Sequence, residues 1–500
     1  MRGLRPIRCA LAVLRFGAVP TTNDSRAAQL THVPVPALPL ERFETVLSVA
    51  QTDELRSNAV RARDVLAGRV VWNLNSTARG GGVAEMLTSL IAYTRGAGVD
   101  ARWTVIEGNP DFFRVTKRIH NRLHGASGDG GLLGGAEEAI YRKVMERNTR
   151  ALDQLIRPGD IAVLHDPQTA GLAAPLRERG VRVVWRCHVG VDSPNGEAHE
   201  AWRFLLPFVR EAEAYVFSRA SFAWDDLEPG GVVVIPPSID AFAPKNQDLE
   251  DATVSAILRC AGIVAGECPG GSVFVRQDGT PGRVDRRADL GGATPLEWTE
   301  PYVVQVSRWD RLKDPVGVLD AFARGIAPRS SAHLVLAGPA VAAVSDDPEG
   351  LQVLEEVGDR RRGLPAALRE RVHLVSLPMD DAAENAAVVN ALQRRAAVVV
   401  QKSLAEGFGL TVAEAMWKGR AVVASRVGGI QDQIRHGETG RLVDPHDLDA
   451  FADAVVGFLD DPEEAARLGA AAKSEITDLF LGPRHLAQYV DLFQRLLSAG

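Results

Sequence analysis

Glu406 and Glu414 lie in the most informative segment of the sequence, which begins at Gln401, where a predicted strand ends. Glu406 falls in a loop, where a carboxylate can accept hydrogen bonds from sugar hydroxyls. Glu414 lies about one turn into the helix that follows, and Thr411 is predicted to cap that helix. Either glutamate alone is typical of a surface carboxylate, which is favourable in the first turn of a helix. Together they predict a binding site, to which a flexible loop adds its backbone: Gly407, Phe408, Gly409 and Leu410.

Two cations, Arg308 and Lys313, lie between another predicted strand and a helix that begins near Pro315. Both side chains can point at one anion over the positively polarised start of that helix. The alternative is that both are solvated cations in an exposed loop. The spacing therefore predicts an anion site, such as a phosphate site, and leaves that alternative open.

The loop Arg79–Gly82 is a second candidate for anion binding, because it joins a predicted strand to a helix that begins near Val83. Free N–H groups at a helix start attract anions, and Gly81 and Gly82 would let a ligand come close to the backbone. A glycine turn that serves only tight packing is an equally good interpretation. The segment is not G-x-G-x-x-G, so a nicotinamide dinucleotide site is not predicted.

Two polar pairs end neighbouring predicted strands in the first half of the chain. His165 and Asp166 form one pair, and Arg186 and His188 belong to the other. The carboxyl ends of parallel strands are where open α/β sheets bind ligands, so His188 is expected to line a cleft. A single histidine is more often structural, but two such pairs at adjacent strand ends favour a functional role.

These residues need elements that place them at strand ends, and the sequence supplies them. Strand patterns alternate with helix patterns in both halves of the chain, which predicts two Rossmann-like, doubly wound α/β domains facing a cleft. The expected organisation is a poorly ordered N-terminal extension, a first domain, a linker with an inserted loop or flap, a second domain, and a C-terminal helix that returns toward the first domain: residues 1–65, 66–242, 243–299, 300–480 and 481–500.

The composition is that of an ordinary globular protein, with 46% hydrophobic and 24% charged residues among 500. A net charge of −7 argues against a protein whose main partner is nucleic acid or an anionic membrane. No apolar run approaches the ~20 residues of a membrane span. The four cysteines include no C-x-x-C pair, so neither a zinc ribbon nor a disulfide scaffold is predicted, and a cytoplasmic location fits best.

The segment Glu406–Glu414 resembles the E-x7-E signature of retaining GT-B glycosyltransferases. Further segments make the chain similar to one family within that group, the trehalose glycosyltransferring synthases, from about Arg69 to the C-terminus. These segments are Asn75–Glu85, Val105–Gly108, Phe112–Lys117, His120–Asn121, Trp185–His188, Pro236–Asp240 and Glu414–Lys418. Residues 1–65 and the insert 266–299 depart from the family pattern.

The resemblance implies a role for each matching residue. Arg308 and Lys313 would bind the donor diphosphate, Glu406 would hold the hydroxyls of the transferred sugar, and Glu414 would hold the donor ribose. The remaining assignments are Gly81, Gly82 and the backbone of 407–411 near the donor, His188 beside the reacting sugar, and Asn75, Glu85 and Arg186 on the acceptor side.

The resemblance also implies the reaction: glucose passes from a nucleoside-diphosphate glucose to free glucose and gives α,α-trehalose, reversibly. No cofactor and no metal ligand are expected, and a homodimer is the expected assembly. Three alternatives stay open, namely a GT-B trehalose phosphorylase, another hexosyltransferase and a catalytically silent nucleotide-sugar sensor. The donor base and the direction of the reaction in the cell stay open as well.

Overall fold

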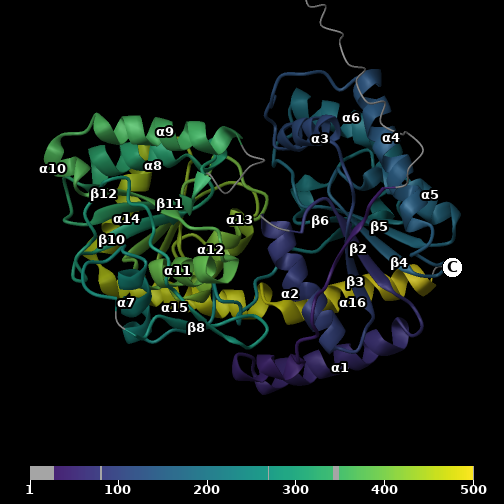
Figure 1. Ribbon diagram of the computed structural model, residues 1–500, viewed down its shortest axis with the longest axis horizontal. Coiled ribbons are helices and arrows are strands. Elements are labelled where there is room, and N and C mark those ends of the chain that lie inside the picture. The colour runs from purple at the N-terminus through teal and green to yellow at the C-terminus, as the bar shows by residue number, and fades with distance from the viewer. Residues whose placement is uncertain (1–27, 79–80, 269, 342–347, 499–500) are drawn as a thin grey trace, which may run out of the picture.

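Two α/β units lie side by side along the longest axis of the molecule, in a computed structural model that describes residues 28–78, 81–268, 270–341 and 348–498 (Figure 1). The N-terminal unit is coloured purple to blue-teal, and the C-terminal unit is mainly green. The architecture is that of two Rossmann-like domains, as the alternating pattern of strands and helices predicted.

The first sheet has seven strands in the order β1-β3-β2-β4-β5-β6-β7. All neighbours are parallel except β1, which runs antiparallel to β3 with Thr31 opposite Val105. The central strands β2 and β4 are buried along their whole length, as expected of a parallel sheet that is covered on both faces. The strands are β1 (Thr31–Val33), β2 (Val71–Asn75), β3 (Ala101–Val105), β4 (Ile161–His165), β5 (Arg182–Cys187), β6 (Ala214–Phe217) and β7 (Val232–Val234).

Helices with defined caps cover this sheet. Asn109 accepts a hydrogen bond from the N–H of Phe112 at the start of α3, and Asn195 caps α6 in the same way. The buried stripe of α3 packs Phe112 and Ile119 into the core between the sheet and α4. These helices are α2 (Gly82–Gly96), α3 (Pro110–Leu123), α4 (Gly135–Leu152), α5 (Ala173–Glu178) and α6 (Gly196–Val209).

The second sheet has six parallel strands in the order β12-β11-β10-β13-β14-β15. The chain leaves β10 toward one edge and returns through β13 on its other side, so loops after these two strands meet at a topological switch point. The strands are β10 (Tyr302–Val306), β11 (His333–Pro339), β12 (Val372–Leu377), β13 (Val398–Gln401), β14 (Val422–Ser425) and β15 (Arg441–Val443). The helices are α8 (Pro315–Ala321), α9 (Pro348–Arg362), α10 (Ala366–Arg369), α11 (Ala382–Arg395), α12 (Leu410–Trp417), α13 (Ile430–Gln433), α14 (Leu448–Asp460) and α15 (Pro462–Leu479).

Residues 28–65 are folded, which corrects the prediction that residues 1–65 form a poorly ordered extension. Besides β1, this segment forms α1 (Val49–Val65), which begins with a capping box between Ser48 and Gln51. Only a narrow stripe of α1, which includes Leu55 and Ala59, is buried. That narrow stripe is why the sequence pattern concealed the helix. Residues 1–27 lie outside the described part of the chain.

The insert between the two units is also ordered where it is described. After α7 (Asp251–Cys260), the chain forms a hairpin of β8 (Val273–Val275) and β9 (Pro281–Arg283). Arg276 in the turn of this hairpin pairs with Asp381 at the start of α11, with Nη1 3.0 Å from Oδ1. The expected loop or flap is therefore held against the second domain. A disulfide joins Cys260 to Cys268, a pairing that the sequence pattern did not predict.

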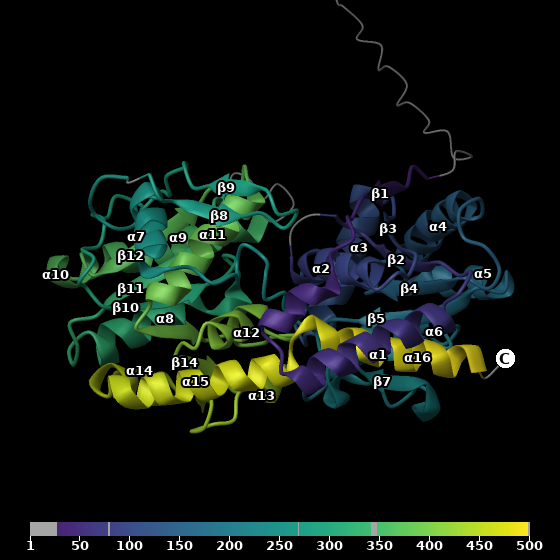
Figure 2. The same cartoon turned by 90° about the horizontal axis from the view of Figure 1, so that it is seen from below.

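The last helix, α16 (Gly482–Ser498), lies beside α1 against the first sheet (Figure 2). Tyr489, Leu492 and Phe493 are buried there, in one cluster with Val163 of β4 and Val184 of β5. Among the described residues, no helix is both long enough and apolar enough to cross a membrane.

Candidate active site

The switch point of the second sheet brings together the predicted anion site and the first glutamate. Lys313 follows β10, Glu406 follows β13, and the Lys313 ammonium forms an ion pair with Glu406 Oε2. Only 18% of the Lys313 side chain and 13% of the Glu406 side chain are exposed, so this pair lies in the protein and not in bulk solvent. Arg308 is half-exposed beside them and pairs with Asp310 at 3.3 Å. The alternative of a solvated cation thus does not describe Lys313.

A second buried lysine, Lys402, supports the loop that carries Lys313. Its ammonium pairs with Asp314 and also donates to the carbonyl of Pro445 at 2.6 Å. Asp314 has a positive φ of 47° and caps α8. The Gln305 amide donates to the Lys313 carbonyl at 2.9 Å and accepts from the Lys402 N–H at 3.0 Å. These contacts fix the backbone at Lys313. The spacing of the residues in the sequence gave no indication that Lys402 supports this loop.

The glycine loop after β13 lies directly against the first domain. A Cβ atom on Gly407 would stand 2.7 Å from the carbonyl oxygen of His188, and one on Gly82 would stand 2.7 Å from Leu410 Cδ1. The Gly407 approach requires glycine, because its neighbour is backbone, whereas the Leu410 side chain next to Gly82 could move; the two domains thus meet at backbone distance at Gly407. Gly81, with φ 81°, begins α2, while Arg79 and Gly80 of the same loop lie outside the described residues.

The cap of α12 differs from the prediction. Gly409 occupies the cap position with a left-handed backbone, φ 88°, and no side chain caps the helix. Thr411 lies inside the first turn and donates its hydroxyl to Gln401 Oε1 at 3.0 Å. The predicted Thr411 cap is therefore wrong, because only glycine adopts this backbone without strain. Phe408 is buried against Phe480.

Glu414 is buried and only partly paired. Lys245 approaches its Oε1 at 3.5 Å, while Oε2 is buried without a hydrogen-bond partner among the described residues. Lys245 also pairs with Glu85 of α2 at 2.7 Å, so it joins a carboxylate from each domain. Burial raises the pKa of Glu414, and Lys245 opposes that rise. Burial lowers the pKa of Lys245, but Glu414 and Glu85 together raise it above its ordinary value. The unpartnered oxygen is suited to accept from a ligand hydroxyl.

The first domain brings His165, Asp166 and His188 together at the ends of β4 and β5. The two imidazole rings stack, and His188 Nε2 lies 3.0 Å from His165 Nδ1. Asp166 has a φ of 63°, and its Oδ1 accepts from the His188 N–H at 2.8 Å. Burial raises the pKa of Asp166 to about 7, whereas burial lowers the pKa of His165 to about 3. The sequence pattern placed Asp166 in one of the two strand-end pairs but predicted no function for it.

Two residues assigned to the acceptor side point into the protein instead of the cleft. The Arg186 side chain is fully buried and donates to Tyr489 and to the carbonyl of Ile235. The Asn75 amide accepts from Trp103 Nε1 at 2.8 Å and donates to the Thr77 carbonyl at 2.6 Å. Their role toward an acceptor stays a prediction, and their contacts favour a supporting role. The third residue of that group, Glu85, is tied to Lys245.

Further contacts that sequence reasoning missed hold the two domains together near the glycine loop. Arg219 of the first domain lies between Asp192 at 2.7 Å and Asp432 of the second domain at 3.2 Å. Asp192 Oδ2 in turn accepts from the Gly428 N–H and from the Gln431 amide, both at 2.9 Å. The sequence carried no signal for the pairs between the domains, because their partners are more than two hundred residues apart.

No metal ligands were assigned from the sequence, although Asp447-Leu448-Asp449 forms a D-x-D triplet, a pattern often found at metal sites. In the structure Asp447 caps α14 by accepting from the N–H of Ala450 at 2.8 Å. Within the described ranges, no group of three or more histidine, cysteine, aspartate or glutamate side chains is arranged to hold a metal ion.

Two family models and several relatives match this chain. One family model, described as the N-terminal domain of trehalose synthase, matches residues 73–224, and another, glycosyl transferases group 1, matches residues 292–475. A trehalose synthase from Rubrobacter xylanophilus is 35% identical over 440 residues, which cover 87% of this chain and 93% of that protein. A trehalose phosphorylase from Pleurotus pulmonarius is 27% identical over 85% of this chain but only 56% of its own length.

Among solved structures, a UDP-forming α,α-trehalose-phosphate synthase from Burkholderia vietnamiensis aligns with a TM-score of 0.61 at 17% identity. The alignment covers 86% of this chain and 99% of that one, and at this identity it shows the fold alone. Fold and family models together define a glycosyltransferase with the GT-B fold. Within that class, the chain belongs to the trehalose synthase family.

Proposed function

We propose that the protein is a retaining glucosyltransferase that moves glucose from ADP-glucose or UDP-glucose to free glucose and forms α,α-trehalose, reversibly. The observation that carries this proposal is the buried Lys313–Glu406 pair at the switch point, directly beside the glycine loop that touches the first domain. A nucleotide sugar presents one charged end and one hydroxyl-rich end. Lys313 offers a cation for the charged end, and Glu406 offers a carboxylate for the hydroxyl-rich end.

Each part of the donor has a matching group in the site. Arg308 and Lys313 face the diphosphate, whose charge grows on the β-phosphate as the glycosidic bond breaks. Glu406 accepts from hydroxyls of the transferred glucose once Lys313 turns to the phosphate. Glu414 Oε2, buried without a partner among the described residues, accepts from the ribose hydroxyls. These cations stabilise the leaving group, so the proposed reaction uses no metal ion and no cofactor.

The proposed chemistry is attack on one face of the sugar. The bond between the anomeric carbon and the β-phosphate oxygen breaks, and the acceptor hydroxyl forms its bond from the same side. The departing phosphate oxygen takes the proton of that hydroxyl, so the configuration is retained without a protein nucleophile. Isolation of a covalent glucosyl-enzyme would contradict this step.

The experiment is incubation of the purified chain with glucose and ADP-, UDP- or GDP-glucose, followed by NMR identification of the disaccharide and chromatography of the nucleotide. Trehalose and free nucleoside diphosphate in equal amounts are the expected result. Glu406→Ala should abolish turnover while its melting curve matches that of the parent protein. Activity that persists in EDTA would agree with the metal-independent mechanism.

Trehalose phosphorylase is the second candidate, because a fungal phosphorylase is 27% identical over 85% of this chain. The same cations suit inorganic phosphate as well as a diphosphate. The two reactions differ in the released product. Turnover of trehalose with phosphate to glucose 1-phosphate, and no reaction with any nucleotide-glucose, would favour the phosphorylase.

A further inference from the structure

We propose that Tyr489, on the C-terminal helix α16, is a positioning residue for His188. It acts through Arg186, whose guanidinium lies between the two side chains. The consequence for turnover rests on the proposed function, in which His188 lies beside the reacting sugar. The positioning itself is a property of the chain alone and can be measured without substrate.

The hydrogen bonds around His188 fix the positions of its protons. Arg186 is a donor only, and its Nε lies 3.4 Å from His188 Nδ1, so that ring nitrogen must be the acceptor. His188 therefore carries its proton on Nε2 and donates it to His165 Nδ1 at 3.0 Å. His165 then carries its proton on Nε2 and donates to Asn73 Oδ1 at 3.1 Å. The series leaves one consistent pair of neutral tautomers.

The electrostatic surroundings favour the same neutral rings. Burial lowers the pKa of His188, and the positive charge of Arg186 lowers it further. His165 and His485 act in the same direction from their own elements. Asp166 accepts a hydrogen bond from the backbone N–H of His188, not from its ring.

Tyr489 determines where the Arg186 guanidinium can lie. Its hydroxyl accepts from Arg186 Nη1 at 2.9 Å, while the carbonyl of Ile235 accepts from Nη2 at 3.0 Å. Because both outer nitrogens are hydrogen-bonded, the planar guanidinium has one orientation, in which Nε points at His188. Tyr489 is buried and lies 303 residues along the chain from Arg186, so α16 supplies a contact that the first domain lacks by itself.

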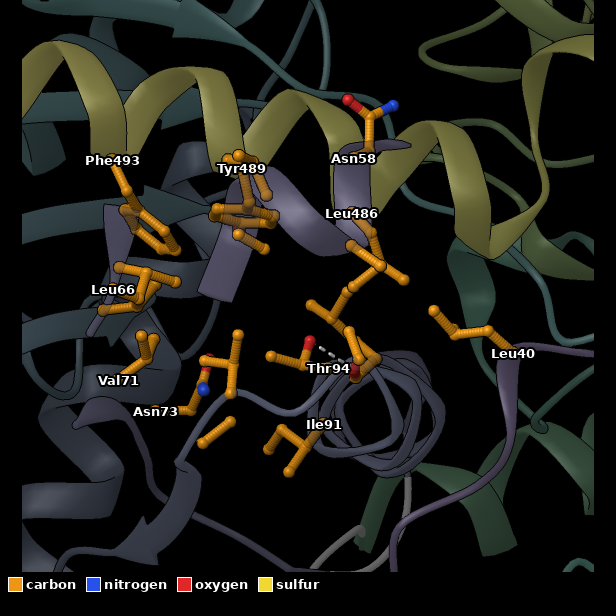
Figure 3. A pocket seen from close by; sticks show the side chains of 18 of the residues that line it. Leu40, Asn58, Leu66, Val71, Asn73, Ile91, Thr94, Leu486, Tyr489 and Phe493 are labelled. Atoms are coloured by element: carbon orange, nitrogen blue, oxygen red, sulfur yellow. Dashed lines mark hydrogen bonds between the residues drawn. The ribbon is translucent and has the colours of Figure 1, made fainter. Parts of the chain in front are cut away.

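The side chains that surround Tyr489 at the cavity offer few polar groups (Figure 3). Tyr489 extends from α16 over a cavity of about 50 Å³, and Asn73 lies on the opposite wall. Most of the lining side chains are apolar, among them Leu66, Ile91 and Phe493. An apolar void of this kind holds water poorly, so loss of the hydroxyl should leave Arg186 Nη1 without an acceptor.

The position of His188 matters because its backbone adjoins the second domain. Its carbonyl oxygen lies against Gly407 in the loop that follows Glu406. A ring that turns or changes tautomer would disturb this contact and the distance between sugar and acceptor. The expected cost falls on the rate of the chemical step and not on donor binding.

The test begins with the ring nitrogens of the full-length protein labelled with 15N-histidine. Long-range proton–nitrogen spectra identify which nitrogen is protonated, and the His188→Gln spectrum assigns the signals. The Nε2–H tautomer is expected for His188 in the parent protein. A parent spectrum with the Nδ1–H tautomer overturns the proposal, whatever the variants do.

The variant is Tyr489→Phe, which removes one oxygen atom and keeps the ring. We expect mixed tautomers at His188 and a kcat about 10- to 100-fold lower, the effect of one lost hydrogen bond to a charged group. The donor KM should change less than about twofold, since the loss is confined to the chemical step. A single Nε2–H tautomer with unchanged kcat would overturn the proposal.

Phe493→Leu is the matched control, because Phe493 lies one turn further along α16 and lines the same cavity without a polar atom. It should lower the melting temperature and leave both the tautomer and kcat unchanged. If it changed the tautomer as much as Tyr489→Phe does, packing of α16 would be the cause, and the proposal would fail. An inactive parent protein with the expected tautomer shift would refute the proposed reaction and leave the positioning intact.

Discussion

Lys245 provides the sharpest test of the proposed donor site, because it joins carboxylates from both domains. Its ammonium is 2.7 Å from Glu85 and 3.5 Å from the buried Glu414. Lys245→Met keeps most of the volume and removes the charge. Burial already raises the pKa of Glu414, and loss of the Lys245 charge should raise it further, so that more of this carboxyl group is protonated.

The size of the effect follows from the hydrogen bonds that Glu414 can accept. An ionised carboxylate accepts both ribose hydroxyls, whereas a protonated one loses its charge-assisted bonds. One such bond contributes ~1.5–3 kcal/mol, which corresponds to a donor KM roughly 10- to 150-fold higher. The change in kcat should be smaller, because the ribose is bound equally in the ground state and the transition state.

The pH dependence has a definite sign. Glu414 is a carboxylic acid with a raised pKa, so its charged form returns as the pH increases. The donor KM of Lys245→Met should therefore fall as the pH rises, and it should change more with pH than the donor KM of the parent protein. Initial rates at varied nucleotide-glucose, at each pH, measure both quantities.

Two variants separate the charge of Lys245 from its volume and from general effects. Lys245→Arg keeps a cation and should stay within a few-fold of the parent KM. Lys473→Met removes an exposed lysine over the Trp417 ring and should not alter the donor KM. An unchanged KM in Lys245→Met, or one that rises with pH, would refute the reasoning about Glu414.

Three further predictions concern the rest of the site. Lys313→Ala should lower kcat/KM by roughly 10- to 150-fold through one lost charge-assisted contact, and an unchanged rate would mean that Lys313 does not touch the donor. Gly407→Ala should lower kcat roughly tenfold or more with little change in melting temperature, because its Cβ would stand 2.7 Å from the His188 carbonyl oxygen; a normal kcat would show that the domains need not approach so closely. The raised pKa of Asp166, about 7, means that the parent protein loses stability as the pH rises from about 4 to 7, since the unfolded chain releases the proton first. Denaturant unfolding should therefore show Asp166→Asn gaining about 2–3 kcal/mol over the parent between pH 5 and pH 8, and parallel pH curves would contradict this.

The site residues whose positions follow from the strands and their order were predicted well from the sequence. Arg308, Lys313 and Glu406 each come shortly after an apolar run, and parallel strands deliver such residues to one edge of the sheet. Because β10 and β13 are neighbours, two loops about ninety residues apart meet. The alternation of strands and helices was sufficient to predict this meeting, and it required no knowledge of side-chain contacts.

Side-chain pairs between residues far apart in the chain were predicted poorly from the sequence. The pairing of Lys245 with Glu414 and the support of Lys313 by Lys402 arise only when loops from different elements are folded together. Competition between two neighbouring residues also explains the incorrect cap prediction for α12. Thr411 is a good capping residue, but Gly409 adopts the left-handed backbone that starts the helix two residues earlier.

The arrangement of the two glutamates explains why the site needs lysines from outside their segment. Glu406 lies in the loop and Glu414 one turn into α12, with the left-handed residue Gly409 between them. A buried carboxylate with no cation beside it would tend to protonate, because burial raises its pKa. Lys313 pairs with the first and Lys245 with the second, and each comes from another part of the chain. In the proposed complex, the donor phosphate takes the place of the Glu406 carboxylate at Lys313, whereas Lys245 stays with Glu414 Oε1 and a ribose hydroxyl donates to Oε2.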